Sequence, residues 1–496
     1  MSERAKSWLA LAVVLLLTAG VFAPAMHYGF LKNWDDGIFI LENRHLDFSV
    51  DNFKRYGLAH YRNLYTPLPM YSLMVDKACF DLEPFGYHLH NLILHLGGAA
   101  LLFAILRALR CSACMSALAT LIWAVNPQKL ESVVWITERK DVQMGLFAFA
   151  AFYCFLWSLR HASKTMGDII GMSVTALFTV MAIFCKPAAV PLVGIYAVWL
   201  LCRRDWREAW RNRVLIPIIA GFGATMWAAY MTAQGNPGGL ERNIFIWLHN
   251  LLWYPASAIV PLFNTNPIYP TVGPVREHLV LLIGAPLAAV ALLYYAWRVR
   301  QIPWLNILTA VLILGGTILP VMGLWHYTAF EYCDRYNYLV SAVAVGLVAL
   351  ALPAHRYMLS AGCVIVALMI AATWLAMPAW RSDEAIAHAC LDRPGRLNRK
   401  AVELAASDAF HRTDPAMLEW IAARLSQDKS FFGTPERTGE NTVLLMQGYA
   451  AYLRDDKAGG DARLAILKRI EAEQGEVKFI RGANYKIVYR YLTTGE

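Results

Sequence analysis

Two adjacent carboxylates, Asp35 and Asp36, follow closely behind the first apolar segment of the chain. Successive side chains point in different directions in a helix or a strand, so one acid can face a bound substrate while a cation or hydrogen bonds hold the other. The competing interpretation is a solvated helix cap, because Asp is a favoured residue at helix N-termini. The pair is therefore a candidate for proton transfer, with the cap as its alternative.

A second cluster places four charges in succession, Glu138, Arg139, Lys140 and Asp141, at the start of another apolar segment. Charge at the edge of the hydrocarbon is costly unless it is paired or has a task. The alternative is an interfacial collar, in which Arg139 and Lys140 extend their charged ends to water.

Further cations lie between later apolar segments. Lys186 is a compact point charge suited to a phosphate, although its long side chain could also extend to water. Arg335 could bind a phosphate through two parallel hydrogen bonds, or pair with Asp334 as a structural contact. The segment around Arg335 also contributes His326, Glu331 and Tyr336.

Cations beside carboxylates suit a reaction in which a phosphate leaves while a hydroxyl loses its proton. These residues can act together only if the segments that carry them end at one face of the molecule. The architecture of the chain therefore decides whether they form one site.

Composition indicates an all-α protein that crosses a membrane many times. The 496 residues are 58% hydrophobic and only 16% charged, whereas soluble domains are roughly a quarter charged. A spanning helix needs about 20 mainly apolar residues. We predict eleven spans, near 7–26, 87–106, 112–126, 142–159, 168–185, 187–202, 213–231, 279–297, 303–321, 337–353 and 357–378.

The basic residues are distributed according to the predicted spans. The net charge is +9, but the basic residues sit between hydrophobic segments, which argues against nucleic acid as a partner. Short cytoplasmic loops are enriched in Lys and Arg, so Arg4, Lys6 and the run from Arg203 to Arg213 place those segments inside. The ambiguous stretch 247–263 is then re-entrant or interfacial, because a full crossing would put Arg298, Arg300 and Arg356 outside. The loops 27–86, 127–141, 232–278 and 322–336 lie outside.

We predict two domains. Residues 1–380 form the membrane domain, whose long first loop, 27–86, is rich in aromatic residues and should be ordered as short interfacial helices around a rigid Thr66–Pro69 turn. Residues 381–496 form a small helical domain on the exported side, with Gly459-Gly460 separating two of its helices. A cleaved signal peptide is the alternative for the first segment.

The motifs resemble those of the GT-C superfamily of integral-membrane glycosyltransferases, in particular the protein O-mannosyltransferases of the transmembrane and tetratricopeptide-repeat branch and their bacterial relatives. The resemblance covers roughly residues 25–340 and rests on motifs that recur in order. These are Trp34-Asp35-Asp36 with Asn43, Tyr65-Thr66-Pro67-Leu68, Tyr87 to His95, Asn126-Pro127 to Glu131, Arg139-Lys140-Asp141, Lys186-Pro187 and Asp334-Arg335-Tyr336. Two features depart from the family: an Asp-Asp pair replaces Asp-Glu, and the tail shows no clear repeat.

The resemblance implies transfer of a sugar from a polyprenyl-phosphate donor to an acceptor hydroxyl, with inversion, on the exported side of what would be a bacterial inner membrane. It makes Asp35 the first choice for the general base and Asp36 the second. The donor phosphate would be held by Lys186 and Arg335, with Arg139 and Lys140, and supported by Glu138, Asp141, His326, Asp334 and Tyr336. The acceptor would be a protein or a glycan.

Several questions stay open at this level. No set of ligands has the spacing of a metal site, yet acids in two loops leave a divalent ion open. A lipid A or polysaccharide acceptor and a non-enzymatic transporter or flippase are the alternative functions. A transporter should carry its charges near the midplane and often shows inverted repeats, neither of which is visible here.

Overall fold

The computed structural model describes most of the chain, and it forms two compact units. The first comprises 1–30, 39–265 and 273–378, and the second 31–38, 266–272 and 379–496. The described residues are 2–61, 65–160, 165–203, 213–235, 239–240, 243–260, 265–270, 272, 275–326, 330–393, 397–428, 437–480 and 483–494. Residues 204–212 of the arginine-rich run fall outside these ranges.

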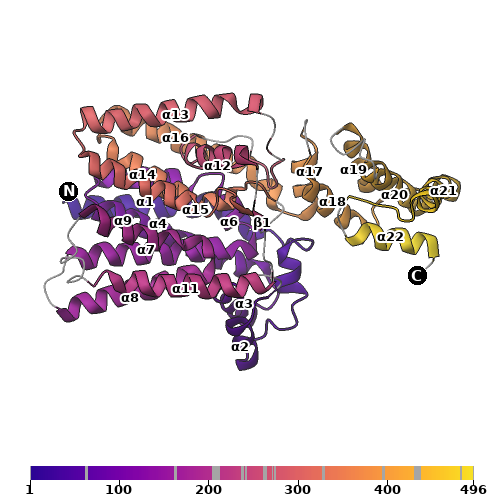
Figure 1. Ribbon diagram of the computed structural model, residues 1–496, viewed down its shortest axis with the longest axis horizontal. Helices are drawn as coiled ribbons and strands as arrows, with labels where there is room; N and C mark the ends of the chain where they lie inside the picture. The colour runs from indigo at the N-terminus through magenta and orange to yellow at the C-terminus, as the bar shows by residue number, and fades with distance from the viewer. Residues whose placement is uncertain are drawn as a thin grey trace. The chain divides into compact units, whose positions relative to one another are not determined.

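The first unit is a bundle of apolar helices, because a chain in lipid must satisfy its own backbone hydrogen bonds. Among the described residues, seven helices, some of them together with the short turns that adjoin them, are long and apolar enough to cross a membrane, and Figure 1 shows α7, α8 and α11 running side by side. They are α1 (Glu3–Phe22), α4 (Pro84–Ala108), α7 (Arg139–Arg160), α8 (Thr165–Cys185), α11 (Leu215–Gly235), α13 (Leu279–Tyr294) and α16 (Arg356–Ala376). The predicted all-helical membrane fold is confirmed.

Shorter helices occupy the other four predicted spans. They are α5 (Ala113–Ala124), α9 (Pro191–Arg203) with the turn η4 (Pro187–Ala189) before it, α14 (Trp304–Ile318) and α15 (Asn337–Ala351). The count of eleven spans stays a prediction.

The described part of the 247–263 stretch lies largely in α12 (Ile244–Ser257), which has Pro255 inside it. Its 14 residues extend about 21 Å, less than the roughly 30 Å of a bilayer core. That length fits the predicted re-entrant or interfacial segment. Nearby, two short strands, β1 (Gly239–Leu240) and β2 (Trp325–His326), pair antiparallel with Gly239 opposite His326.

Hydrogen bonds between buried polar groups link several helices of the bundle. His95 Nδ1 lies 2.8 Å from the Tyr338 hydroxyl, and Trp123 Nε1 donates to the Tyr338 carbonyl at 3.0 Å. These contacts join α4, α5 and α15. The first helix is part of the same packing, because Trp374 of α16 donates to the Val21 carbonyl at 3.2 Å.

The described part of the first loop is largely helical. It follows η1 (Ala23–His27) and contains η2 (Gly37–Leu41), α2 (Val50–Leu58) and α3 (Pro67–Phe80). The predicted rigid turn at Thr66–Pro69 is wrong: Thr66 is the N-cap of α3 and Pro67 begins the helix. Proline fits the first turn of a helix because its missing N–H has no partner there anyway.

The second unit is built on helices that each pack against the next from α17 to α21, while α22 packs against α20. They are α17 (Asp383–Leu391), α18 (Arg399–His411), α19 (Pro415–Gln427), α20 (Thr438–Leu453), α21 (Lys457–Gln474) and α22 (Ala483–Thr494), after the turn η8 (Met377–Trp380). The unit also takes in 31–38 and 266–272, which the sequence had assigned to the membrane domain.

The predicted break at Gly459-Gly460 is wrong, because both glycines lie inside α21. The chain instead turns before Asp456, whose carboxylate caps the helix by accepting the Gly459 N–H at 2.9 Å. Glycine at 460 serves packing, since a Cβ there would lie 2.7 Å from the Tyr452 ring.

Candidate functional site

The charged residues of the first unit come from four short segments that follow or precede long helices. Glu131 lies in α6 (Lys129–Val133), and Glu138 ends the turn η3 (Ile136–Glu138) from which α7 begins. Lys186 links α8 to η4. Arg335 lies in the turn η7 (Asp334–Tyr336) just before α15. Residues up to about 200 positions apart thus come together.

Lys186 is held by two carboxylates from the start of α7. Its Nζ lies 2.6 Å from Asp141 Oδ1 and 3.4 Å from Glu138 Oε2. Burial opposes the charge, but Asp141 and Glu138 outweigh it and raise the pKa of Lys186 above its ordinary value. Lys186 therefore stays cationic across the pH range in which proteins work.

Arg335 forms the other cationic centre. Its backbone N–H donates to Glu131 Oε2 at 2.8 Å, its guanidinium pairs with the same carboxylate, and its Nε lies 3.7 Å from Glu138 Oε1. The guanidinium carbon lies 5.5 Å from the Trp135 ring and 5.3 Å from the Tyr336 ring. Burial raises the pKa of Glu131, against the opposing charge of Arg335.

Glu131 was quoted in the sequence motif but given no role. Its position two residues after Lys129 and four before Trp135 carries no signal for its partner, which lies 204 residues away.

Lys140 completes the cluster. Its Nζ lies 3.1 Å from Glu138 Oε1 and 5.7 Å from the Phe39 ring centre. Glu138 therefore contacts Lys140, Lys186 and Arg335 at once.

A small pocket lies beside this cluster. One part of its wall is charged, with Asp141, Lys186 and Arg335, while the rest is largely apolar. The remaining lining residues are Met144, Ala188, Thr317, Val321, Tyr336, Leu339 and Val340.

Asp334 and Tyr336, the neighbours of Arg335 in η7, contact different residues. Asp334 accepts a hydrogen bond from Gln128 Nε2 at 3.0 Å, and the Tyr336 ring centre lies 5.4 Å from Lys186 Nζ. His326 lies in β2, and its side chain is outside what the structure describes.

Arg139 belongs to a different cluster from Lys186 and Arg335. It is fully buried, pairs with Asp76 of α3, and donates to Asn91 Oδ1 at 2.7 Å and to the Tyr87 carbonyl at 2.9 Å. The other oxygen of Asp76 lies 2.6 Å from His90 Nδ1. This arrangement joins α3, α4 and α7.

Arg139→Met is expected to destabilise the protein by about 3–5 kcal/mol, because it leaves the Asp76 carboxylate buried without its cation. Thermal unfolding in detergent measures the effect. The control is Arg454→Ala, which breaks an exposed pair with Glu419 and should cost less than about 1 kcal/mol. Equal stability of the two variants would contradict a structural role for Arg139.

The adjacent acids, Asp35 and Asp36, lie in the second unit. Asp36 is only 1% exposed, and its Oδ2 accepts the Leu31 N–H at 3.0 Å. Asp35 is partly exposed. Of the residues predicted to meet, Asp141, Lys186 and Arg335 do so within the first unit, and the inclusion of Asp35 stays a prediction.

Within the described ranges, no group of three or more His, Cys, Asp or Glu side chains is placed to hold a metal ion. The cysteines are free thiols, including Cys111 and Cys114.

Comparisons with curated proteins agree with the resemblance seen in the motifs, although no protein-family model matches the chain. The chain is 26% identical over 135 residues to protein O-mannosyl-transferase tmtc2 of Xenopus laevis, covering 27% of this chain and 16% of that protein. It is 28% identical over 235 residues to protein O-mannosyl-transferase Tmtc3 of Drosophila melanogaster, covering 40% of this chain and 23% of that protein. The predicted resemblance to protein O-mannosyltransferases is confirmed, and the matches span less than a quarter of either relative.

Among solved structures, ArnT from Cupriavidus metallidurans bound to undecaprenyl phosphate aligns with a TM-score of 0.42 and 14% identity, over 98% of this chain and 75% of that one. The apo structure of the same protein aligns with a TM-score of 0.41.

Proposed function

We propose that this chain transfers a sugar from a polyprenyl-phosphate donor to an acceptor hydroxyl, most simply one on a protein, at the outer face of a bacterial inner membrane. The proposal includes a membrane domain over 1–380 and an exported domain over 381–496. The likeness to protein O-mannosyltransferases supports glycosyl transfer as the reaction.

The observation that carries the proposal is the pocket lined by Lys186 and Arg335. Its composition suits a polyprenyl phosphate, since the cations offer hydrogen bonds to phosphate oxygens while the apolar wall accepts the first isoprene units. An ammonium group has three donors, and Asp141 and Glu138 account for two of those of Lys186. A phosphate oxygen can take the third.

The carboxylates of the cluster have a supporting task in this mechanism. Glu131, Glu138 and Asp141 fix the positions of the cations before the donor binds, so little reorganisation is needed as charge develops on the departing phosphate. Lys140, which pairs with Glu138, contributes further positive charge. We assign Arg139 to structural support, because Asp76, Asn91 and Tyr87 engage its guanidinium.

The reaction itself is a single displacement. The acceptor oxygen attacks the anomeric carbon, the bond from that carbon to the phosphate oxygen breaks, and the acceptor proton passes to Asp35. The polyprenyl phosphate leaves with the bonding electrons, paired with Lys186 and Arg335. The partial exposure of Asp35 and the burial of Asp36 support Asp35 as the base.

Lys186→Ala is expected to raise KM for the donor by about 10-fold or more, because a charge-assisted hydrogen bond is worth about 1.5–3 kcal/mol. Purified enzyme should be assayed with undecaprenyl-phosphate-linked mannose and an acceptor peptide that contains Ser and Thr. Lys77→Ala is the matched control, since Lys77 pairs with the exposed Asp47 at 2.8 Å. An unchanged KM for the donor in Lys186→Ala would show that Lys186 has only a structural role.

A further inference from the structure

The segment that carries the two acids is attached to the C-terminal helices through its backbone. The Lys32 and Asn33 N–H groups donate to the two oxygens of Asp383, at 2.9 and 3.2 Å. Asp383 is the first residue of α17 and lies about 350 positions further along the chain. One carboxylate thus fixes two successive peptide groups.

The Asn33 side chain gives a second attachment, on α18. Its Nδ2 donates to Asp408 Oδ1 at 2.8 Å, and its Oδ1 lies 3.0 Å from His411 Nδ1. Both oxygen and nitrogen of the amide are therefore engaged, which fixes the rotation of the side chain as well as its position.

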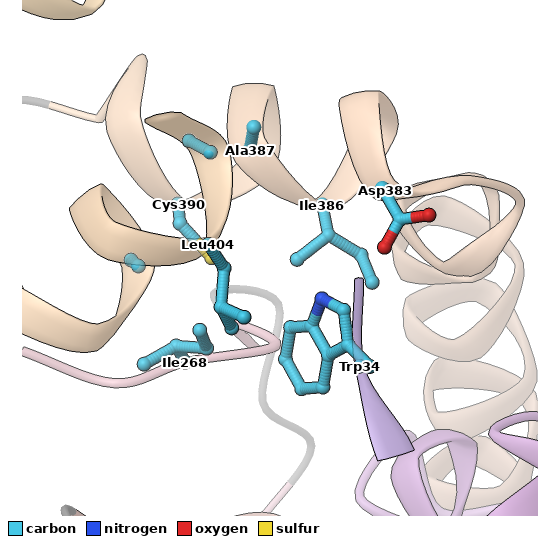
Figure 2. A pocket seen from close by; sticks show the side chains of 9 residues that line it. Trp34, Ile268, Asp383, Ile386, Ala387, Cys390 and Leu404 are labelled. Carbon is cyan, nitrogen blue, oxygen red and sulfur yellow. The ribbon is translucent and has the colours of Figure 1, made fainter. Parts of the chain in front are cut away.

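Trp34 forms a third, apolar attachment. It is 5% exposed and lines a small pocket with Ile268, Ile386 and Leu404. Figure 2 shows its indole ring beside Ile386, with Asp383 near the same ring. The ring also meets Trp380 edge to face, with 6.2 Å between ring centres.

These attachments leave the adjacent carboxylates little freedom. Asp35 is one residue beyond Trp34, and one residue spans at most about 3.6 Å of chain. On the C-terminal side of Asp35, the Asp36 side chain accepts a hydrogen bond from the Leu31 N–H, which links the two ends of the segment 31–36. The position of Asp35 therefore depends on residues that lie after the last predicted span.

We propose that the C-terminal helices position the general base, with Asp383 as the positioning residue that holds the Lys32–Asn33 backbone. This inference rests on the proposed function for the identity of the base. The C-terminal helices then contribute to sugar transfer itself, in addition to any role in recognising an acceptor.

The test compares Asp383→Ala with Glu384→Ala in the full-length protein. Glu384 is the next residue of the same helix, and it makes an exposed pair with Arg412 at 2.7 Å. Two quantities are measured: hydrogen exchange of the Lys32 and Asn33 amides, and the kcat and donor KM with undecaprenyl-phosphate-linked mannose. A conservative variant, Asp383→Asn, retains one accepting oxygen.

Asp383→Ala should speed the exchange of both amides and lower kcat by about 10- to 100-fold, since small displacements of a reacting group cost that much, while donor KM stays unchanged. Asp383→Asn should recover part of the loss, and Glu384→Ala should match the wild type in both measurements. A purely structural role would lower the amount of folded protein without separating kcat from KM.

Unchanged amide exchange in Asp383→Ala would overturn the attachment, and faster exchange with unchanged kcat would overturn its importance for transfer. If the wild-type protein transferred no sugar in this assay, the proposed function itself would be wrong. In that event the exchange measurement, which needs no activity, still decides whether Asp383 holds the segment.

Discussion

Asp35→Asn is expected to lower kcat for sugar transfer by at least about 100-fold, the usual contribution of a general base. The amide has nearly the shape of the carboxylate but cannot take the acceptor proton. Because Asp35 is only partly buried, the substitution should leave expression and thermal unfolding close to wild type. Initial rates with undecaprenyl-phosphate-linked mannose at saturating donor measure the loss.

Asp36→Asn is the matched control, one residue away. Its remaining oxygen can still accept the Leu31 N–H, which Asp36 accepts at 3.0 Å in the wild type, so the turn should persist and the rate should fall far less. The reverse pattern, with Asp36→Asn inactive and Asp35→Asn active, would identify Asp36 as the base. Near wild-type transfer by both variants would show that neither acid takes the proton.

The spanning segments could be predicted from sequence because long apolar runs are a local signal. Each of the eleven predicted segments contains a helix, and the charged residues near the ends of several of them gather into one cluster. Asp141, Lys186 and Arg335 could be foreseen as neighbours, since lipid excludes isolated charges and drives them to pair.

The attachments of individual residues could not be predicted in the same way. Arg139 and Arg335 both stand beside an acid in sequence, yet one pairs with Asp76 and the other with Glu131. Every residue except proline carries a backbone N–H group, so a sequence does not indicate which of these groups will donate to a distant side chain. The hydrogen bonds from Lys32 and Asn33 to Asp383 hold the acidic segment within the second unit. Composition had assigned the same segment to the membrane domain.

Arg335→Met is expected to have two separable effects, loss of fold stability and loss of transfer. Glu131 is buried and both its oxygens are engaged by Arg335, so removing the guanidinium leaves an uncompensated charge that costs about 3–5 kcal/mol. Thermal unfolding in detergent should show this destabilisation. Transfer should also fail, because the departing phosphate loses a cation.

The double variant Glu131→Gln with Arg335→Met separates the two effects. A neutral pair of similar volume should restore most of the stability, since replacing a buried ion pair with uncharged groups is often neutral or stabilising. Sugar transfer should stay low, because no cation replaces Arg335 at the pocket wall. A double variant that is stable and also transfers at a near wild-type rate would show that Arg335 only holds Glu131 in place, and that Lys186 alone suffices for the phosphate.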